Sequence, residues 1–269
     1  MATKKADDLD GSEPRDVAIP ILVESMGGQL FALGTRFCGD RGEAEDLVQE
    51  TFLRAYHSWE QFRGDSKAST WLYAIASRVC QRMHRKRSGE PDRLESIEEL
   101  LPLGEPHMGV VPSEQDPLAL EIRRESRERV EAAIAQLPPD FRQPLVLKEI
   151  AGFTLDQIAT ILGIKPETVK TRLHRARLKV RNALEETLPK REVPPPAYSK
   201  QVCLDLLQAK QDSLDAGAEF EFPDKMICER CEEFFATLDL EGALCQEIAS
   251  GAMPESLRHE LLERLTSEG

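Results

Sequence analysis

Four cysteines in the last quarter of this 269-residue chain have the side chains and the spacing of a metal site. Cys228 and Cys231 form a C-x-x-C pair, with Cys203 25 positions before it and Cys245 14 positions after it. Thiolates are soft ligands that favour zinc over calcium or magnesium, and four of them close a tetrahedral site. We therefore expect one zinc ion, or another thiophilic metal, held by Cys203, Cys228, Cys231 and Cys245.

Two other interpretations of these cysteines stay open. One is a thiol redox switch, and the other is a helical appendage whose thiols bind no metal. A thiol enzyme is disfavoured, because the acidic residues around the C-x-x-C pair raise the thiol pKa and so reduce the fraction of nucleophilic thiolate. The sequence offers no arrangement of nucleophile, base and orienting acid and no glycine-rich phosphate loop. We therefore expect no enzymatic activity.

A strongly basic segment lies earlier in the chain. Residues 165–181 carry seven Lys or Arg side chains and a single acid, Glu167. Before them, Ala159 is small enough for two helices to cross closely and Gly163 suits a left-handed turn, while Val169 is placed to pack a second helix onto the first. This pattern predicts a helix-turn-helix whose second helix enters the major groove of DNA without any cofactor. The candidate DNA contacts are Lys165, Thr168, Lys170, Thr171, Arg172, His174 and Arg175.

The net charge of −13 argues against DNA binding only until it is divided along the chain. Residues 71–87 carry five Lys or Arg and no acid, which makes a second basic helix. By contrast, residues 88–117 have a net charge of −7 and residues 200–269 a net charge of −10. The acid therefore lies outside the two segments that would face DNA.

The elements that must position these residues are helical. Apolar residues recur at steps of three and four from residue 40 to 59, the period of one helix face. Similar patterns predict helices over residues 30–37, 69–87 and 118–137, and three short helices follow. Proline-rich stretches predict two linkers. No stretch approaches the roughly 20 consecutive apolar residues that span a bilayer, so we expect a cytoplasmic protein with no membrane partner.

We expect an all-α fold with two small helical domains and a third helical piece. The predicted boundaries are residues 15–87 for the first domain, 88–117 for an acidic linker, 118–187 for the helix-turn-helix domain, 188–200 for a Pro-rich linker, and 201–269 for an acidic, cysteine-containing extension.

Two segments resemble a known family. GTRFCGDRGEAEDLVQETFLRAY, residues 34–56, with the helix around Trp71, is similar to region 2 of the extracytoplasmic-function sigma factors of the sigma-70 family. LPPDFRQPLVLKEIAGFTLDQIATILGIKPETVKTRLHRARLKV, residues 137–180, is similar to their region 4. The resemblance covers about residues 15–187, and the two signatures occur in the expected order. The departures are Gln157, where an acid is usual, and the Lys-Pro-Glu sequence that enters the recognition helix.

The resemblance implies a subunit of bacterial RNA polymerase that directs promoter-specific initiation of transcription. Its partners would be core RNA polymerase and promoter DNA. Region 4 would bind the minus-35 duplex. The helix that docks on the polymerase clamp matches Asp46, Leu47, Gln49, Glu50 and Phe52. The helix that captures the melted minus-10 element would present Arg78, Arg82, Arg85, Lys86 and Arg87.

Two alternative functions are a helix-turn-helix regulator that works without the polymerase and a thiol- or metal-handling protein. The region 2 signature distinguishes a sigma factor from a helix-turn-helix regulator, because an ordinary regulator does not need it. Measuring the metal content and the number of titratable thiols would identify a thiol- or metal-handling protein.

The extension resembles the zinc-binding anti-sigma domain, whose motif is H-x-x-x-C-x-x-C. Asp224 stands at the histidine position, so Asp224, Cys245 and His259 are all candidates to complete the site. An acidic domain on a short tether has a high effective concentration beside the basic helices. We hypothesise regulation in cis, in which the extension docks on the DNA-binding surfaces and metal loading or thiol oxidation changes that docking. The sequence leaves open whether the extension inhibits or activates.

Overall fold

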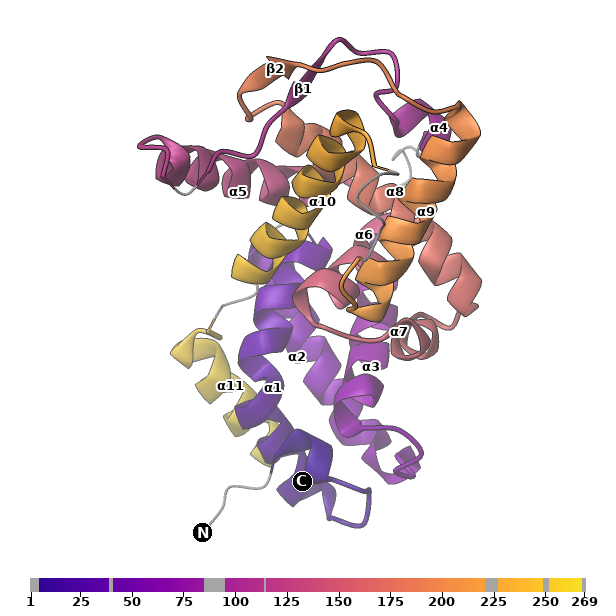
Figure 1. Cartoon of the computed structure of the whole chain (residues 1–269). Coiled ribbons are helices and arrows are strands. Elements are labelled where there is room, and N and C mark those ends of the chain that lie inside the picture. Colours follow the sequence, from indigo (N-terminus) through magenta and orange to yellow (C-terminus); the bar gives the residue numbers. More distant parts are fainter. Residues whose placement is uncertain are drawn as a thin grey trace. The chain divides into compact units, whose positions relative to one another are not determined.

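The computed structural model of the chain describes residues 5–38, 41–84, 95–113, 115–220, 227–248 and 252–267. These residues form helices and one two-stranded sheet, so the predicted all-α fold is confirmed (Figure 1). The chain divides into two compact units, each with its own core. The first unit comprises residues 1–90, 156–166 and 249–269, and the second comprises residues 91–155 and 167–248.

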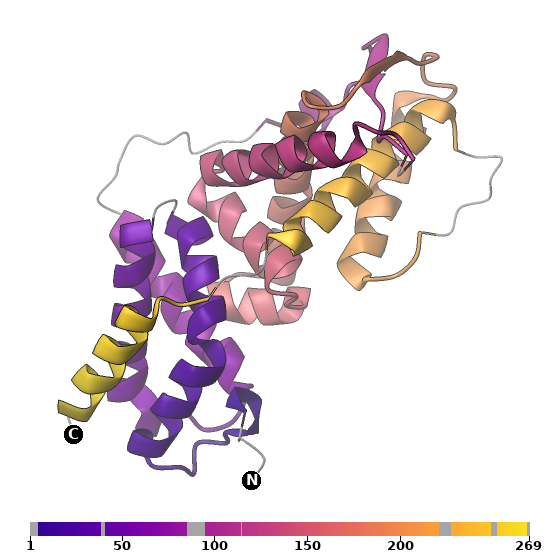
Figure 2. The ribbon, with the colours of Figure 1, turned by 90° about the vertical axis from the view of Figure 1, so that its left-hand side faces the viewer.

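The first unit is a helical bundle. In it α1 packs against α2 and α3, and α11, from the far end of the chain, packs against α1 and α2 (Figure 2). Its elements are α1 (Arg15–Cys38), α2 (Arg41–Ser58), α3 (Ala68–His84), α7 (Leu155–Leu162) and α11 (Glu255–Ser267), with the short 3-10 helices η1 (Ala6–Asp8) and η2 (Trp59–Gln61).

α1 begins at Arg15, whereas the sequence predicted a helix only from residue 30. Pro20 and several glycines weaken the helical pattern in this part of the chain. Gly34 shows what one of these glycines does, because a Cβ atom there would lie 3.3 Å from the Cβ of Ala44 on α2. The glycine allows the two helices to approach closely.

α1 is also long and apolar enough, by length and composition, to cross a membrane over Arg15–Phe37. The apolar side chains have another explanation in this structure, because 61% of the most apolar window is buried. Leu22, Leu30 and Phe37 are fully buried in the core of the first unit. α1 is therefore the central core helix of this bundle.

The second unit contains the described parts of both predicted linkers and most of the predicted extension, which therefore divides between the two units. Its elements are α4 (Ile97–Leu100), β1 (His107–Gly109), α5 (Ala119–Gln136), α6 (Pro139–Leu145), the π-helix η3 (Val146–Ile150), α8 (Pro166–Glu185), β2 (Lys190–Glu192), α9 (Lys200–Ala216) and α10 (Glu229–Glu247).

The two predicted linkers pair with each other. β1 and β2 run antiparallel, with Met108 opposite Arg191 and Gly109 opposite Lys190. Met108 is fully buried. The first linker, which we expected to be exposed, is therefore partly buried at Met108 and Gly109, whereas the three residues of β2 in the second linker are exposed. Strands of three residues are too short to produce a periodic pattern that sequence analysis detects.

A buried arginine holds both linkers against α10. The Arg230 guanidinium donates hydrogen bonds to the carbonyl oxygens of Pro102 (3.0 Å), Glu105 (2.7 Å), Val193 (3.4 Å) and Pro194 (3.1 Å). Each of these carbonyls would otherwise lack a partner or require water. Arg230 lies inside the C-x-x-C motif, so the cysteine-bearing turn and the linkers form one structure.

One apolar core unites the recognition region with the extension. It contains side chains from α8, α9, α10 and both linkers, and its buried members are Leu100, Met108, Leu178, Val193, Leu206, Leu207, Cys231, Phe234, Phe235 and Leu238. The extension helices α9 and α10 thus share a core with α8.

Replacing Arg230 with Met should destabilise the second unit. The substitution keeps an apolar stem but removes the buried donor that joins four carbonyl oxygens of the two linkers, so we expect the free energy of unfolding to fall by about 3 kcal/mol. Urea unfolding followed by circular dichroism measures it. The control is Arg191→Met, because the guanidinium of Arg191 is half exposed beside Glu229 and Glu233. This control should cost less than about 1 kcal/mol, and an equal loss in both variants would contradict the role of Arg230.

Candidate nucleic-acid interface

The helix-turn-helix segment has the local structure that its sequence predicted. Gly163 follows α7 with φ of +67°, a left-handed conformation that favours glycine. α8 starts at Pro166, where a missing N–H costs nothing. Lys165 and Thr171 are exposed, and Thr168 is half-buried.

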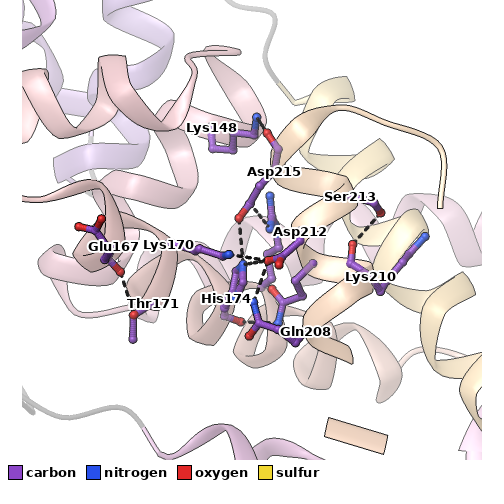
Figure 3. Close-up of polar contacts among 12 residues, drawn as sticks. Lys148, Glu167, Lys170, Thr171, His174, Gln208, Lys210, Asp212, Ser213 and Asp215 are labelled. Carbon is purple, nitrogen blue, oxygen red and sulfur yellow. Dashed lines mark hydrogen bonds and ion pairs between the residues drawn. The ribbon is translucent and has the colours of Figure 1, made fainter. Parts of the chain in front are cut away.

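Three basic side chains of α8 pair with two acids of α9 (Figure 3). The Lys170 Nζ lies 2.8 Å from an Asp212 carboxylate oxygen. The His174 Nε2 lies 2.9 Å from Asp215, and the Arg177 Nη1 lies 2.7 Å from the other oxygen of the same carboxylate. His174 is only 3% exposed. His174, a predicted DNA contact, is therefore not accessible to DNA in this structure, because α9 covers it.

The remaining candidate contacts of α8 are partly available. Arg172 is half-buried and pairs at 2.7 Å with Asp140 of α6. Arg175 is also half-buried, and its Nε is buried without a hydrogen-bond partner. The acids of α9 thus lie against Lys170 and His174, while α6 supplies the acid beside Arg172.

Arg177 is the most enclosed of these cations. Its Nε donates to Glu149 of η3 at 2.8 Å, and its side chain is 1% exposed. Burial disfavours the charge of Arg177, but Glu149 and Asp215 outweigh it and hold its pKa above the ordinary value. Burial likewise raises the pKa of Asp215, yet the hydrogen bond from His174 and the charge of Arg177 bring it below the ordinary value. The side chains of Arg177 and Asp215 are therefore both ionised.

His174, Asp212 and Asp215 also have the geometry of a metal site, since their ligand atoms lie within 4.8 Å of one another. Both carboxylates already pair with cations, Asp212 with Lys170 and Asp215 with Arg177. These two positive charges repel a divalent ion and explain the cluster as an ion-pair network.

The predicted polymerase-binding residues divide into two groups. Leu47 and Phe52 are fully buried between the helices of the first unit, so their assignment to the polymerase surface is wrong. The apolar period of the helix already placed both on its inner face. Asp46 is exposed and Gln49 and Glu50 are half-buried, so these three remain accessible.

The basic end of α3 presents two of its predicted DNA contacts. Arg78 and Arg82 are exposed and line one surface cavity with Gln61 and Gln81. Arg85, Lys86 and Arg87 lie outside the described residues.

Aromatic side chains beside this surface belong to the core. Phe62 is buried and Trp71 half-buried, and their ring centroids lie 5.1 Å and 5.6 Å from that of Trp59. This cluster fixes the loop between α2 and α3.

Comparisons with known protein families match both segments that the sequence singled out. The Sigma-70 region 2 family matches residues 22–90, and the Sigma-70 region 4 family matches residues 127–180. The RNA polymerase sigma-H factor of Pseudomonas aeruginosa is 33% identical over 171 residues, which cover 64% of this chain and 88% of that protein. The chain belongs to the ECF sigma factors of the sigma-70 family. It therefore serves RNA polymerase in promoter-specific transcription.

Two further proteins are similar to this sigma factor. The ECF RNA polymerase sigma factor SigE of Mycolicibacterium smegmatis is 33% identical over 165 residues, which cover 61% of this chain and 60% of that protein. Among solved structures, CnrH in complex with the cytosolic domain of CnrY is 22% identical, covers 68% of this chain and 99% of that chain, and has a TM-score of 0.47. The two family matches end before α9.

Three of the four cysteines in this additional part of the sigma factor lie around one pocket. Cys203 comes from α9, Cys228 precedes α10, and Cys231 lies in its first turn. Burial raises the pKa of Cys203, and burial with the neighbouring Cys228 raises the pKa of Cys231 to about 12. Burial also opposes ionisation of Cys228, but hydrogen bonds from the backbone at Ala197 and Cys231 lower its pKa. Cys228 is therefore the most readily ionised of the three.

Cys245 does not belong to this group, so its assignment as a ligand is wrong. Cys231 and Cys245 both lie on α10, 14 residues apart, which separates them by about 21 Å along the helix axis. The Cys245 thiol instead donates to Glu241 at 3.4 Å.

His259, another candidate for the fourth ligand, does not line this pocket. His259 belongs to the first unit, where it is exposed and pairs with Glu263 at 3.1 Å. Asp224 lies outside the described residues. The three sulfurs are also not within 4.8 Å of one another, since the described residues contain a single group of that kind, the one around His174.

Glu241 should make the stability of α10 depend on pH. Burial and the nearby Glu149 raise its pKa to about 8. An acid whose folded-state pKa is raised favours the folded state at low pH, and that stability is lost as pH rises through the folded pKa. As the pH rises from about 5 to about 8, we expect the protein to lose a few kcal/mol of stability, and to lose no more from this group above about pH 8.

Glu241→Gln should abolish most of this pH dependence, and hydrogen exchange of α10 amides measures it. The matched control is Glu232→Gln, which changes an exposed side chain of the same helix. Glu232→Gln should leave the dependence intact. A pH dependence that persists in Glu241→Gln would show that Glu241 is not its source.

Proposed function

We propose that this sigma factor is restrained in cis, with α9 covering the promoter-reading face of α8. The observation that carries the proposal is the network of Asp212 and Asp215 with Lys170, His174 and Arg177. Lys170 and His174 are among the residues expected to contact the minus-35 duplex. A phosphate backbone and the carboxylates of α9 compete for the same cations.

Geometry supports exclusion as well as charge competition. His174 is 3% exposed and cannot reach a base while α9 lies over it. The Gln211 side chain of α9 also donates to the backbone carbonyl of His174 at 3.4 Å. Occupation of this face by α9 and insertion of α8 into a major groove are therefore mutually exclusive.

The tether strengthens these contacts. Only residues 186–199 separate α8 from α9, and part of that stretch is held as β2. A short connection gives the covering helix a high effective concentration, so individually weak ion pairs suffice to keep it in place.

Asp215→Asn should release the restraint. The substitution keeps the shape of the side chain but removes the charge that holds His174 and Arg177, so α9 should leave α8 more often. We expect affinity for a minus-35 duplex to rise by about fivefold, because binding scales with the uncovered fraction. Fluorescence anisotropy measures it on a duplex selected from a random library by the polymerase holoenzyme. Transcription from the same promoter gives a second readout.

The matched control is Asp205→Asn, which removes an equal charge from the exposed side of α9. It should change duplex affinity by less than about twofold, through long-range electrostatics alone. An equal gain in duplex affinity in both variants would mean that the change in net charge, and not the release of α9, causes the effect. Weaker transcription by Asp215→Asn would mean that α9 activates, which contradicts the proposal.

We further propose that Cys203, Cys228 and Cys231 bind one zinc ion. Three thiols from two helices are a soft donor set that suits zinc. Because the sulfurs are not yet at mutual ligand spacing, binding would draw α9 and α10 together and so tighten the cover on α8. A metal would supply structural stabilisation here, and oxidation of the low-pKa Cys228 is the alternative chemistry.

Metal analysis of the purified protein tests this proposal. We expect about one zinc per chain in the wild type and a large loss in Cys203→Ser and Cys228→Ser, because each removes one of three ligands. Cys245→Ser is the matched control and should retain the metal. Loss of zinc from Cys245→Ser, or a metal-free wild type whose thiols form a disulfide, would contradict zinc binding; the second result would favour a redox switch.

A further inference from the structure

The last helix of the chain, α11, packs on region 2 through an apolar stripe. Leu257, Leu261 and Leu265 recur at steps of four and are 4%, 1% and 4% exposed. This spacing places them on one face of the helix. α11 lies along α1 and α2 within the first unit (Figures 1 and 2). The stripe is therefore buried against the helices of region 2.

Two contacts fix the position of α11 on α1. A Cβ atom at Gly27 would lie 2.7 Å from the terminal methyl and 3.3 Å from the sulfur of Met253, just before α11. Gly27 thus makes room for the Met253 side chain. One turn earlier on α1, Glu24 forms an ion pair with Arg258.

α11 also reaches the surface expected to bind the polymerase. Arg264 lines a cavity of about 520 Å³ together with Asp46, Gln49 and Glu50 of α2. These three are the accessible members of the set that matches the family's docking helix. The opposite wall is formed by α3, through Arg82 and other side chains.

We infer that α11 and core RNA polymerase compete for the same face of region 2, so that only one of them is bound there at a time. A partner that fills the cavity beside Asp46 and Glu50 meets Arg264 and the adjoining turn of α11, so the helix must move first. The apparent affinity for the polymerase is then reduced by the fraction of time that α11 is released. This inference rests on the proposed restraint in cis but concerns the polymerase, whereas α9 acts on DNA.

The chain allows α11 to be displaced without altering the polymerase-facing side chains. In Gly27→Glu, the new side chain enters the space of Met253 alone and should push α11 away. The matched control is Gln29→Glu, which adds the same charge to an exposed position of α1. A second variant, Leu261→Asp, places a carboxylate at the most buried position of α11 and favours its release.

The experiment measures binding of each full-length variant to immobilised core RNA polymerase. Hydrogen exchange of residues 257–265 reports whether α11 is released. We expect Gly27→Glu and Leu261→Asp to lose protection there and to bind at least about fivefold more tightly than the wild type. Gln29→Glu should match the wild type in both measurements.

Release of α11 with unchanged or weaker polymerase binding would overturn the inference. If Gly27→Glu does not release α11, Leu261→Asp provides the same test, through hydrogen exchange of α11 and binding to core polymerase. Duplex binding by Asp215→Asn is measured without the polymerase. The two experiments therefore test restraint by α9 and competition by α11 independently, and one proposal can be contradicted while the other stands. Failure of the wild type and every variant to bind polymerase would instead count against the assigned docking surface.

Discussion

The buried guanidinium of Arg177 is the group on which the second unit depends. An arginine that is 1% exposed loses its hydration, and several kcal/mol must be recovered from partners. Those partners come from two elements, Glu149 of η3 and Asp215 of α9. Two segments distant in sequence therefore have to meet around one side chain of α8. Removing α9 leaves this charge partly unpaired, which explains why α8 and the extension share a core.

This requirement gives the acidity of the chain a physical meaning. The extension from residue 200 onward carries a net charge of −10, and part of that charge faces the most basic helix of the protein. Half-exposed pairs such as Lys170 with Asp212 contribute little to stability, since water and salt screen them. The buried pair of Arg177 with Asp215 supplies specificity, because it accepts only one register of α9 on α8.

Much of this could be predicted from the sequence, and the omissions share a cause. The helical period located α2, α3 and α8, and Gly163 and Pro166 located the turn between the helices. The same period placed Leu47 and Phe52 inside, although the family resemblance assigned them to the polymerase surface. Pairing of β1 with β2, the cover over His174 and the separation of Cys245 from the other thiols depend on contacts between distant segments. Residue spacing alone carries no such information.

The two helices of the proposed restraint, α9 and α11, differ in the forces that hold them. α9 is held over α8 by three charged or polar pairs together with the buried leucines Leu206 and Leu207, whereas α11 is held on region 2 mainly by three buried leucines. Apolar burial is insensitive to salt, and each leucine gives about 2 kcal/mol before the entropy of ordering is subtracted. Rising ionic strength therefore loosens the outer pairs of α9 while leaving α11 in place. Under the proposed restraint, a single change in solution conditions does not release both surfaces, and the partners of the sigma factor have to displace the two helices in separate steps.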